Sequence, residues 1–200
     1  MPNVAGRDIE ELLSALGAEL DSVASPHVGL CVIGGAALGA LGLVDRPTKD
    51  IDVVASLEAS AAGIRVQALS ALPDAVAKAA AEVAEQFGIE GWWINVGPSS
   101  LMDAGVPSGF ESRLTAVAYG STLTIYFASR VDQICFKTYA AADVGGRHVT
   151  DLVALLPTEQ EMEFALRWVV RHDPSEGFRS QLRELADYLG VPCVLDRIEE

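Results

Sequence analysis

Residues 32–53 constrain the fold more than any other part of this 200-residue chain. An apolar run ends at Gly34-Gly35, a segment of small apolar residues follows, and after a turn a second apolar run carries Asp50 and Asp52. A glycine pair between a strand and a helix lets the backbone approach a ligand closely, because no Cβ intervenes, and the amides that open the helix point at an anion. By itself, such a pair more often marks only a turn.

The two acids add a second constraint. Residues i and i+2 of a strand project to the same face, so the sequence predicts that Asp50 and Asp52 stand side by side while Ile51 and Val53 face the core. Two adjacent carboxylates repel each other unless a cation lies between them, and ligation by oxygen alone suits Mg²⁺. The alternative is that the two acids are solvated on an edge strand. The spacing alone does not decide between a cation site and this alternative.

The composition is that of a globular protein, with 50% apolar and 21% charged residues. It excludes intrinsic disorder, collagen and a coiled coil. No apolar run reaches the roughly 20 residues of a membrane helix, and the acidic start of the chain is unlike a signal peptide. Three scattered cysteines indicate neither a disulfide framework nor a zinc site. We therefore expect a soluble, cytoplasmic protein without a membrane partner.

The net charge of −14 opposes broad binding of polyanions. Nine of the 14 basic residues lie in the second half of the chain, so a local anion-binding face there stays open. Arg167 with Arg171 and Arg179 with Arg183 are spaced i,i+4 among acids, which favours solvated, salt-bridged faces. A face for an RNA end or an acidic partner is the alternative.

Hydrophobic periodicity predicts an α+β protein with a small sheet and helices over 1–128 and a helical part over 129–200 packed on it. We expect strands at 27–33, 51–55, 92–96, 114–119 and 121–127, and helices at 7–20, 36–43 and 74–87. Trp92 and Trp93 fall on opposite faces of their strand, so at most one is core. In the helical part, Thr158 and Glu161 have capping-box spacing, and Asp173-Pro174 predicts the start of a further helix.

The combination of these features resembles the nucleotidyltransferase superfamily, whose motif is a strand, Gly-Gly, a helix and Asp-x-Asp on the next strand. Here 14 residues (36–49) separate Gly35 from Asp50, and Arg46-Pro47-Thr48 precedes the acids. In this form the motif is similar to that of minimal nucleotidyltransferases of the AbiEii toxin type and their uncharacterised relatives. A weaker similarity covers 121–156 and includes Lys137.

The resemblance implies a nucleotidyltransferase-like fold, with a mixed sheet flanked by helices. It also implies a nucleoside triphosphate with its phosphates over Gly34-Gly35, one or two Mg²⁺ held by Asp50 and Asp52, and transfer of a nucleotidyl group to an acceptor with loss of pyrophosphate. Lys137 would place a point charge on a phosphate, unless it only reaches solvent. Arg46 and Thr48 belong to the implied nucleotide site, with bracing of the turn as the alternative role of Arg46.

The acceptor stays open among an RNA end, a protein and a small molecule. The toxin members of the family make a toxin of a toxin–antitoxin pair, with a cognate protein partner, an expectation as well.

One element of the superfamily pattern is missing. Many members carry a third carboxylate on a later strand, whereas here strand 92–96 offers Asn95 and strand 121–127 has no acid. Asn95 can ligate Mg²⁺ or hydrogen-bond a sugar hydroxyl, but it cannot accept a proton as a general base. The sequence therefore leaves two functions open: a Mg²⁺-dependent nucleotidyltransferase, and a catalytically silent nucleotide-binding or interaction module of the same fold.

Overall fold

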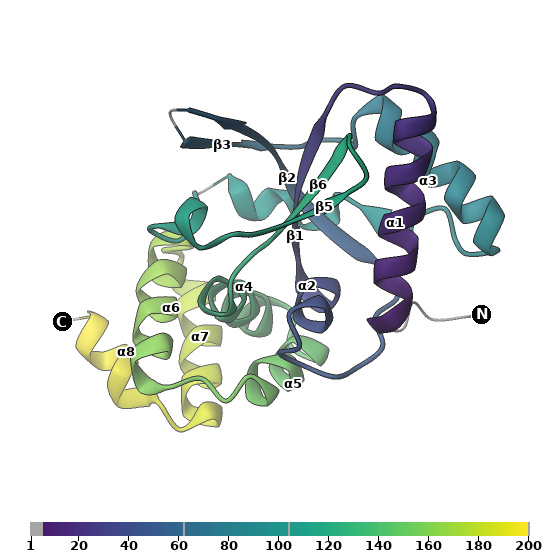
Figure 1. The fold of residues 1–200 in the computed structure, drawn as a ribbon. Helices are drawn as coiled ribbons and strands as arrows, with labels where there is room; N and C mark the ends of the chain where they lie inside the picture. The colour runs from purple at the N-terminus through teal and green to yellow at the C-terminus, as the bar shows by residue number, and fades with distance from the viewer. Residues whose placement is uncertain (1–5, 62, 104, 200) are drawn as a thin grey trace. The chain divides into compact units, whose positions relative to one another are not determined.

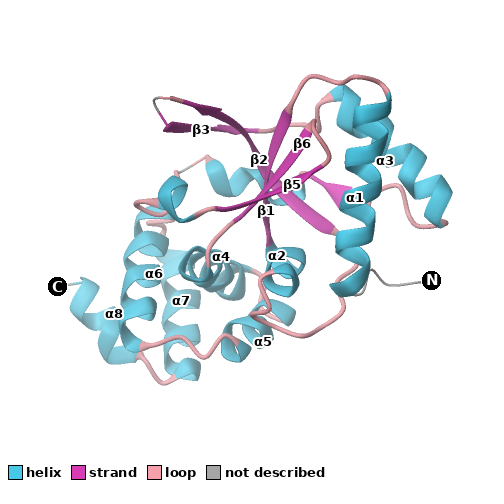
Figure 2. Ribbon diagram, in the orientation of Figure 1, coloured by secondary structure: helices cyan, strands magenta, loops and turns pink. Residues whose placement is uncertain are grey.

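The structure is a computed structural model that describes residues 6–61, 63–103 and 105–199 (Figure 1). The chain divides into two compact units. The first comprises Met1–Asp103 and Gly109–Ala128, and the second comprises Ala104–Ser108 and Ser129–Glu200. Within the described residues, every strand belongs to the first unit and the second unit is helical (Figure 2).

The first unit is built on one mixed sheet. Its described strands are β1 (Val28–Ile33), β2 (Ile51–Ser60), β3 (Gly63–Ala68), β4 (Ile94–Asn95), β5 (Thr115–Tyr119) and β6 (Leu123–Phe127). They are ordered β3-β2-β1-β6-β5, with β1 antiparallel to β2 and parallel to β6. The short β4 pairs parallel with the first two residues of β2. It lies on the same edge of β2 as β3, which pairs with the later residues of that strand, because β1 occupies the opposite edge. The mixed sheet flanked by helices that the sequence predicts is confirmed.

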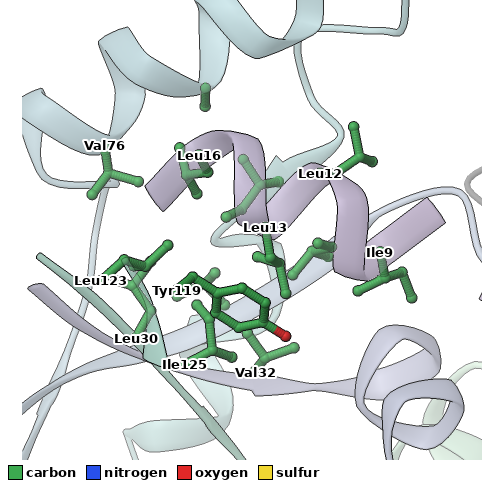
Figure 3. Close-up of a cluster of buried hydrophobic side chains, with 14 of the residues drawn as sticks. Ile9, Leu12, Leu13, Leu16, Leu30, Val32, Val76, Tyr119, Leu123 and Ile125 are labelled. Atoms are coloured by element: carbon green, nitrogen blue, oxygen red, sulfur yellow. The ribbon is translucent and has the colours of Figure 1, made fainter. Parts of the chain in front are cut away.

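Two amphipathic helices, α1 (Gly6–Ser22) and α3 (Asp74–Phe87), pack on one face of this sheet, and α2 (Gly34–Ala40) follows β1. Alternate strand residues face these helices, since side chains of a strand alternate between its faces. Figure 3 shows the resulting cluster, in which Leu13 and Leu16 of α1 lie over Leu30 and Ile125 of the sheet. Each of these buried side chains contributes roughly 1.5–3 kcal/mol relative to exposure.

The second unit contains the helices α4 (Arg130–Asp143), α5 (Arg147–Ala154), α6 (Glu159–His172), α7 (Glu176–Leu189) and α8 (Pro192–Glu199). Two of its helix starts follow directly from the sequence. Ser129 caps α4 by accepting a hydrogen bond from the Asp132 amide, and Thr158 with Glu161 forms the complete capping box of α6. Among the described residues, no helix combines the length and the apolar character needed to cross a bilayer.

Four elements differ from the sequence-based expectations. The helix expected at 36–43 spans Gly34–Ala40, so it begins with the glycine pair itself. Strand 51–55 continues to Ser60 and turns back into β3, whose mostly exposed residues lack the apolar run that would reveal a strand. The strand expected at 92–96 is only two residues long. The N-cap of α7 is Ser175 and not Asp173, because Asp173 still closes α6 through its backbone N–H while the Ser175 hydroxyl accepts from the Phe178 amide.

Candidate functional site

The glycine turn lies against one of the two predicted metal ligands. In the β1–β2 ladder, Ile33 is paired with Asp52, so the glycine pair that follows Ile33 and opens α2 begins beside this carboxylate. Gly34 has a φ of +72°, which side chains rarely tolerate, and a Cβ placed on it would lie 2.6 Å from Asp52 Oδ2. Both the backbone conformation and the neighbouring carboxylate therefore require glycine here.

Gly35 is in contact with the Arg46-x-Thr48 segment. A Cβ on Gly35 would lie 2.7 Å from Thr48 Oγ1 and 3.1 Å from Arg46 Nη2. Thr48 is only 3% exposed, and its hydroxyl donates to the Asp50 carbonyl oxygen at 3.2 Å, while Arg46 Nη1 donates to the Pro47 carbonyl oxygen at 3.0 Å. The turn before the acids is thereby held against the glycine pair, and Arg46 does brace its own turn.

The two acids occupy different positions at the start of β2. Asp52 is the second residue of the strand, between the fully buried Ile51 and Val53. Asp50 immediately precedes the strand and is positioned through its carbonyl by Thr48. Both residues are half-buried.

Asn95 is brought next to Asp52. The two residues are register partners on the parallel pair β2–β4, and paired residues of neighbouring strands project to the same face. The Asn95 amide oxygen accepts a hydrogen bond from the Gly97 amide at 2.8 Å, and its Nδ2 donates to the Trp92 carbonyl oxygen at 3.5 Å. This side chain therefore shapes the loop after β4 as well as standing beside the carboxylate.

The donor set suits a hard divalent cation. Asp52 with its register partner Asn95, and Asp50 just before the strand, offer carboxylate and amide oxygens, which are the ligands that Mg²⁺ prefers. Across the part of the chain that the structure describes, no group of three or more His, Cys, Asp or Glu residues is arranged to hold a metal ion. Mg²⁺ commonly takes only one or two carboxylates from a protein, with water and substrate phosphates completing its shell, so Asp50 and Asp52 fit that use.

Lys137 belongs to the second unit and lies in a buried ion pair. Its Nζ is 2.7 Å from Asp151 Oδ2, with side-chain exposures of 6% and 1%, so this ion pair links α4 to α5. The alternative in which Lys137 only reaches solvent is therefore wrong.

The mixed sheet and the helices that pack on it define an α+β protein with a nucleotidyltransferase-like fold. Residues 8–153 match the family described as nucleotidyltransferase of unknown function (DUF6036), and the chain belongs to this family. Comparisons with curated proteins and with solved structures gave no match.

Proposed function

We propose that this protein is a Mg²⁺-dependent nucleotidyltransferase that moves a nucleotidyl group from a nucleoside triphosphate to an acceptor hydroxyl. The observation that carries the proposal is the contact between the Gly34 turn and the Asp52 carboxylate. A triphosphate needs a backbone that it can approach closely, and its cation needs a carboxylate ligand. This contact places a glycine backbone and a carboxylate next to each other. Membership of a nucleotidyltransferase family supports the same reaction class.

In the proposed reaction, the oxygen of the acceptor hydroxyl attacks the α-phosphorus and its proton is released to water, while the bond from the α-phosphorus to the bridging oxygen breaks and pyrophosphate leaves. Asp50 and Asp52 would hold a magnesium ion, which when bound would neutralise charge on the attacking and leaving oxygens. Gly34 and Gly35 allow the phosphates to approach the backbone. Thr48 keeps the turn closed on Gly35, and Arg46 contributes positive charge from the same turn.

Lys137 is assigned to a phosphate in this proposal, as a point charge from the helical unit. Its ion pair with Asp151 complicates the test, because a neutral substitution also disturbs folding. Lys137→Arg keeps the charge but changes its geometry. We expect it to lower the rate of transfer per folded molecule at saturating triphosphate, with the folded fraction measured by circular dichroism. An unchanged rate per folded molecule would remove Lys137 from the site.

The proposal leaves the acceptor open among three kinds of molecule: an RNA end, a protein side chain and a small molecule. The form Arg46-x-Thr48-x-Asp50-x-Asp52 favours the AbiEii toxin type and hence a toxin whose cognate partner is an antitoxin. Each neutralised phosphate requires a Lys or Arg, so the net charge of −14 favours contact with a short end of an RNA over an extended RNA surface.

A catalytically silent nucleotide-binding module of the same fold is the second candidate. Asn95 favours the silent module. It stands beside Asp52, where a carboxylate could take the proton of the acceptor hydroxyl but an amide cannot. Such a module would bind a triphosphate in a metal-dependent manner without releasing pyrophosphate.

The deciding experiment incubates the protein with Mg²⁺ and each α-labelled nucleoside triphosphate, with total RNA and cell lysate as acceptors. Asp52→Asn removes the ligand charge, and Asp45→Asn is its matched control, since Asp45 is an exposed acid of the preceding loop. We expect label to enter a macromolecule with wild type and Asp45→Asn but not with Asp52→Asn. Metal-dependent binding without label transfer would favour the silent module, and absence of binding would overturn both.

A further inference from the structure

The helical unit contains a cavity that the proposed transfer chemistry does not use. It measures about 320 Å³, at the lower end of the range of small-molecule sites. The C-terminal half of α6 forms one wall and the segment containing Val106 forms another. Its lining combines three rings with two guanidinium groups, which are supplied by Phe164, Trp168, His172, Arg167 and Arg171.

Internal contacts hold the aromatic wall in place. Trp168 Nε1 donates a hydrogen bond of 3.2 Å to the Gly105 carbonyl oxygen, which ties the segment carrying Val106 to α6. The Trp168 ring lies 4.6 Å from the His172 ring and meets Phe136 edge-on at 5.5 Å between centroids. Rings that are already fixed lose little entropy when a ligand stacks on them.

The two arginines differ in what already binds them. Arg167 donates to Glu163 at 2.7 Å, so its charge is largely neutralised within the helix. Arg171, one turn further on, is exposed and forms no ion pair with any residue that the structure describes. The salt-bridged face expected from the sequence therefore exists at Arg167 and not at Arg171. A guanidinium presents planar donors that match the oxygens of a phosphate.

We propose that this cavity binds one nucleotide unit, with its base against the rings of Trp168 and His172 and its phosphate on Arg171. A ring surface next to one uncompensated arginine suits a ligand that joins a flat ring to a single phosphate. A free nucleoside monophosphate and the terminal nucleotide of a single-stranded RNA share this chemistry. The site requires no metal and involves neither Gly34 nor Asp52, so it is independent of the proposed transferase activity.

The test titrates the full chain in EDTA by calorimetry. AMP, adenosine, ribose 5-phosphate and a six-nucleotide oligoadenylate with and without a terminal phosphate are the probes. Arg171→Gln removes the phosphate contact. Arg179→Gln makes the same charge change at an exposed arginine of α7 outside the cavity and serves as the matched control. Trp168→Leu removes the stacking ring, and thermal unfolding of each variant is recorded beside the titrations.

We expect AMP to bind more tightly than adenosine or ribose 5-phosphate. Arg171→Gln should weaken AMP about tenfold or more and leave adenosine unchanged, as loss of a hydrogen bond to a charged group predicts. Trp168→Leu should weaken both ligands at least about fivefold. Tighter binding of the phosphorylated oligoadenylate than of AMP would identify an RNA end as the source, and the reverse order would identify a free nucleotide.

Three results would each overturn the proposal. One is the absence of binding at millimolar AMP, and another is an equal effect of Arg171→Gln and Arg179→Gln, which would indicate diffuse charge attraction. The third is loss of AMP binding in Asp52→Asn, which would place the ligand in the first unit. Because Arg171 is exposed, its variant keeps the test decisive even if Trp168→Leu unfolds.

Discussion

Replacing Gly34 with alanine measures the contact on which the candidate site depends. The new Cβ would lie 2.6 Å from Asp52 Oδ2, on a backbone with φ +72°. Gly42 provides a matched control, because it has a similar φ of +63° and a Cβ placed there would meet nothing within 4 Å. The difference between the two substitutions therefore isolates the contact with the carboxylate from the backbone strain.

The magnitudes follow from these two terms. A left-handed conformation costs a residue other than glycine roughly 1–2 kcal/mol, and we expect Gly42→Ala to lower the free energy of unfolding by this amount. Gly34→Ala carries the same strain and in addition overpacks against the carboxylate, which typically costs about 1–3 kcal/mol. In an Asp52→Ala background only the Asp52 Cβ remains, at 3.7 Å, which is an ordinary contact.

The assay is a double-mutant cycle in urea unfolding at positions 34 and 52, with Gly42→Ala measured in both backgrounds. Gly34→Ala should cost about 1–3 kcal/mol more in the wild-type background than in the Asp52→Ala background, while Gly42→Ala costs the same in both. Mg²⁺-dependent triphosphate binding should also be lost in Gly34→Ala and retained in Gly42→Ala. A coupling below about 0.5 kcal/mol between positions 34 and 52 would refute the argument.

Three further predictions concern the stability of the two units. Hydrogen bonds from Thr122 and Ser121 lower the pKa of Asp21 from 3.8 to about 2. Its stabilisation should therefore be complete above pH 3.8 and disappear as the pH falls toward 2, a dependence that denaturation curves of Asp21→Asn should lack. Lys137→Met removes the cation that faces the buried Asp151 carboxylate, so it should lower the free energy of unfolding by about 3–5 kcal/mol, and adding Asp151→Leu should restore most of this loss in urea unfolding. Thr158→Ala removes the capping box of α6 and should cost about 1 kcal/mol in the same assay, whereas a change near zero would mean that the cap is replaced by water.

Elements defined by local chemistry were predictable from the sequence. The helix predicted at 74–87 has these bounds in the structure, since its apolar spacing and the flanking Pro73 and Gly88 mark both ends. The expectation that at most one tryptophan of the pair is core is confirmed, with Trp93 at 1% exposure and Trp92 at 50%. The cap of α7 was mispredicted because Asp173 and Ser175 are both good N-caps, and only the end of α6 decides between them.

Of the candidate site, the sequence by itself determined the chemical parts: two glycines after a strand, two acids at the start of the next, and a turn with Arg46 and Thr48 between them. Tertiary structure decided which parts touch. Asp52 lies against Gly34 and beside Asn95, and Thr48 lies against Gly35. These contacts depend on how β2 is aligned with β1 and β4. A shift of one residue in that alignment would turn every side chain of the strand to the opposite face. Burial of alternate residues such as Ile51 and Val53 selects one alignment, and only the folded sheet provides the core that buries them.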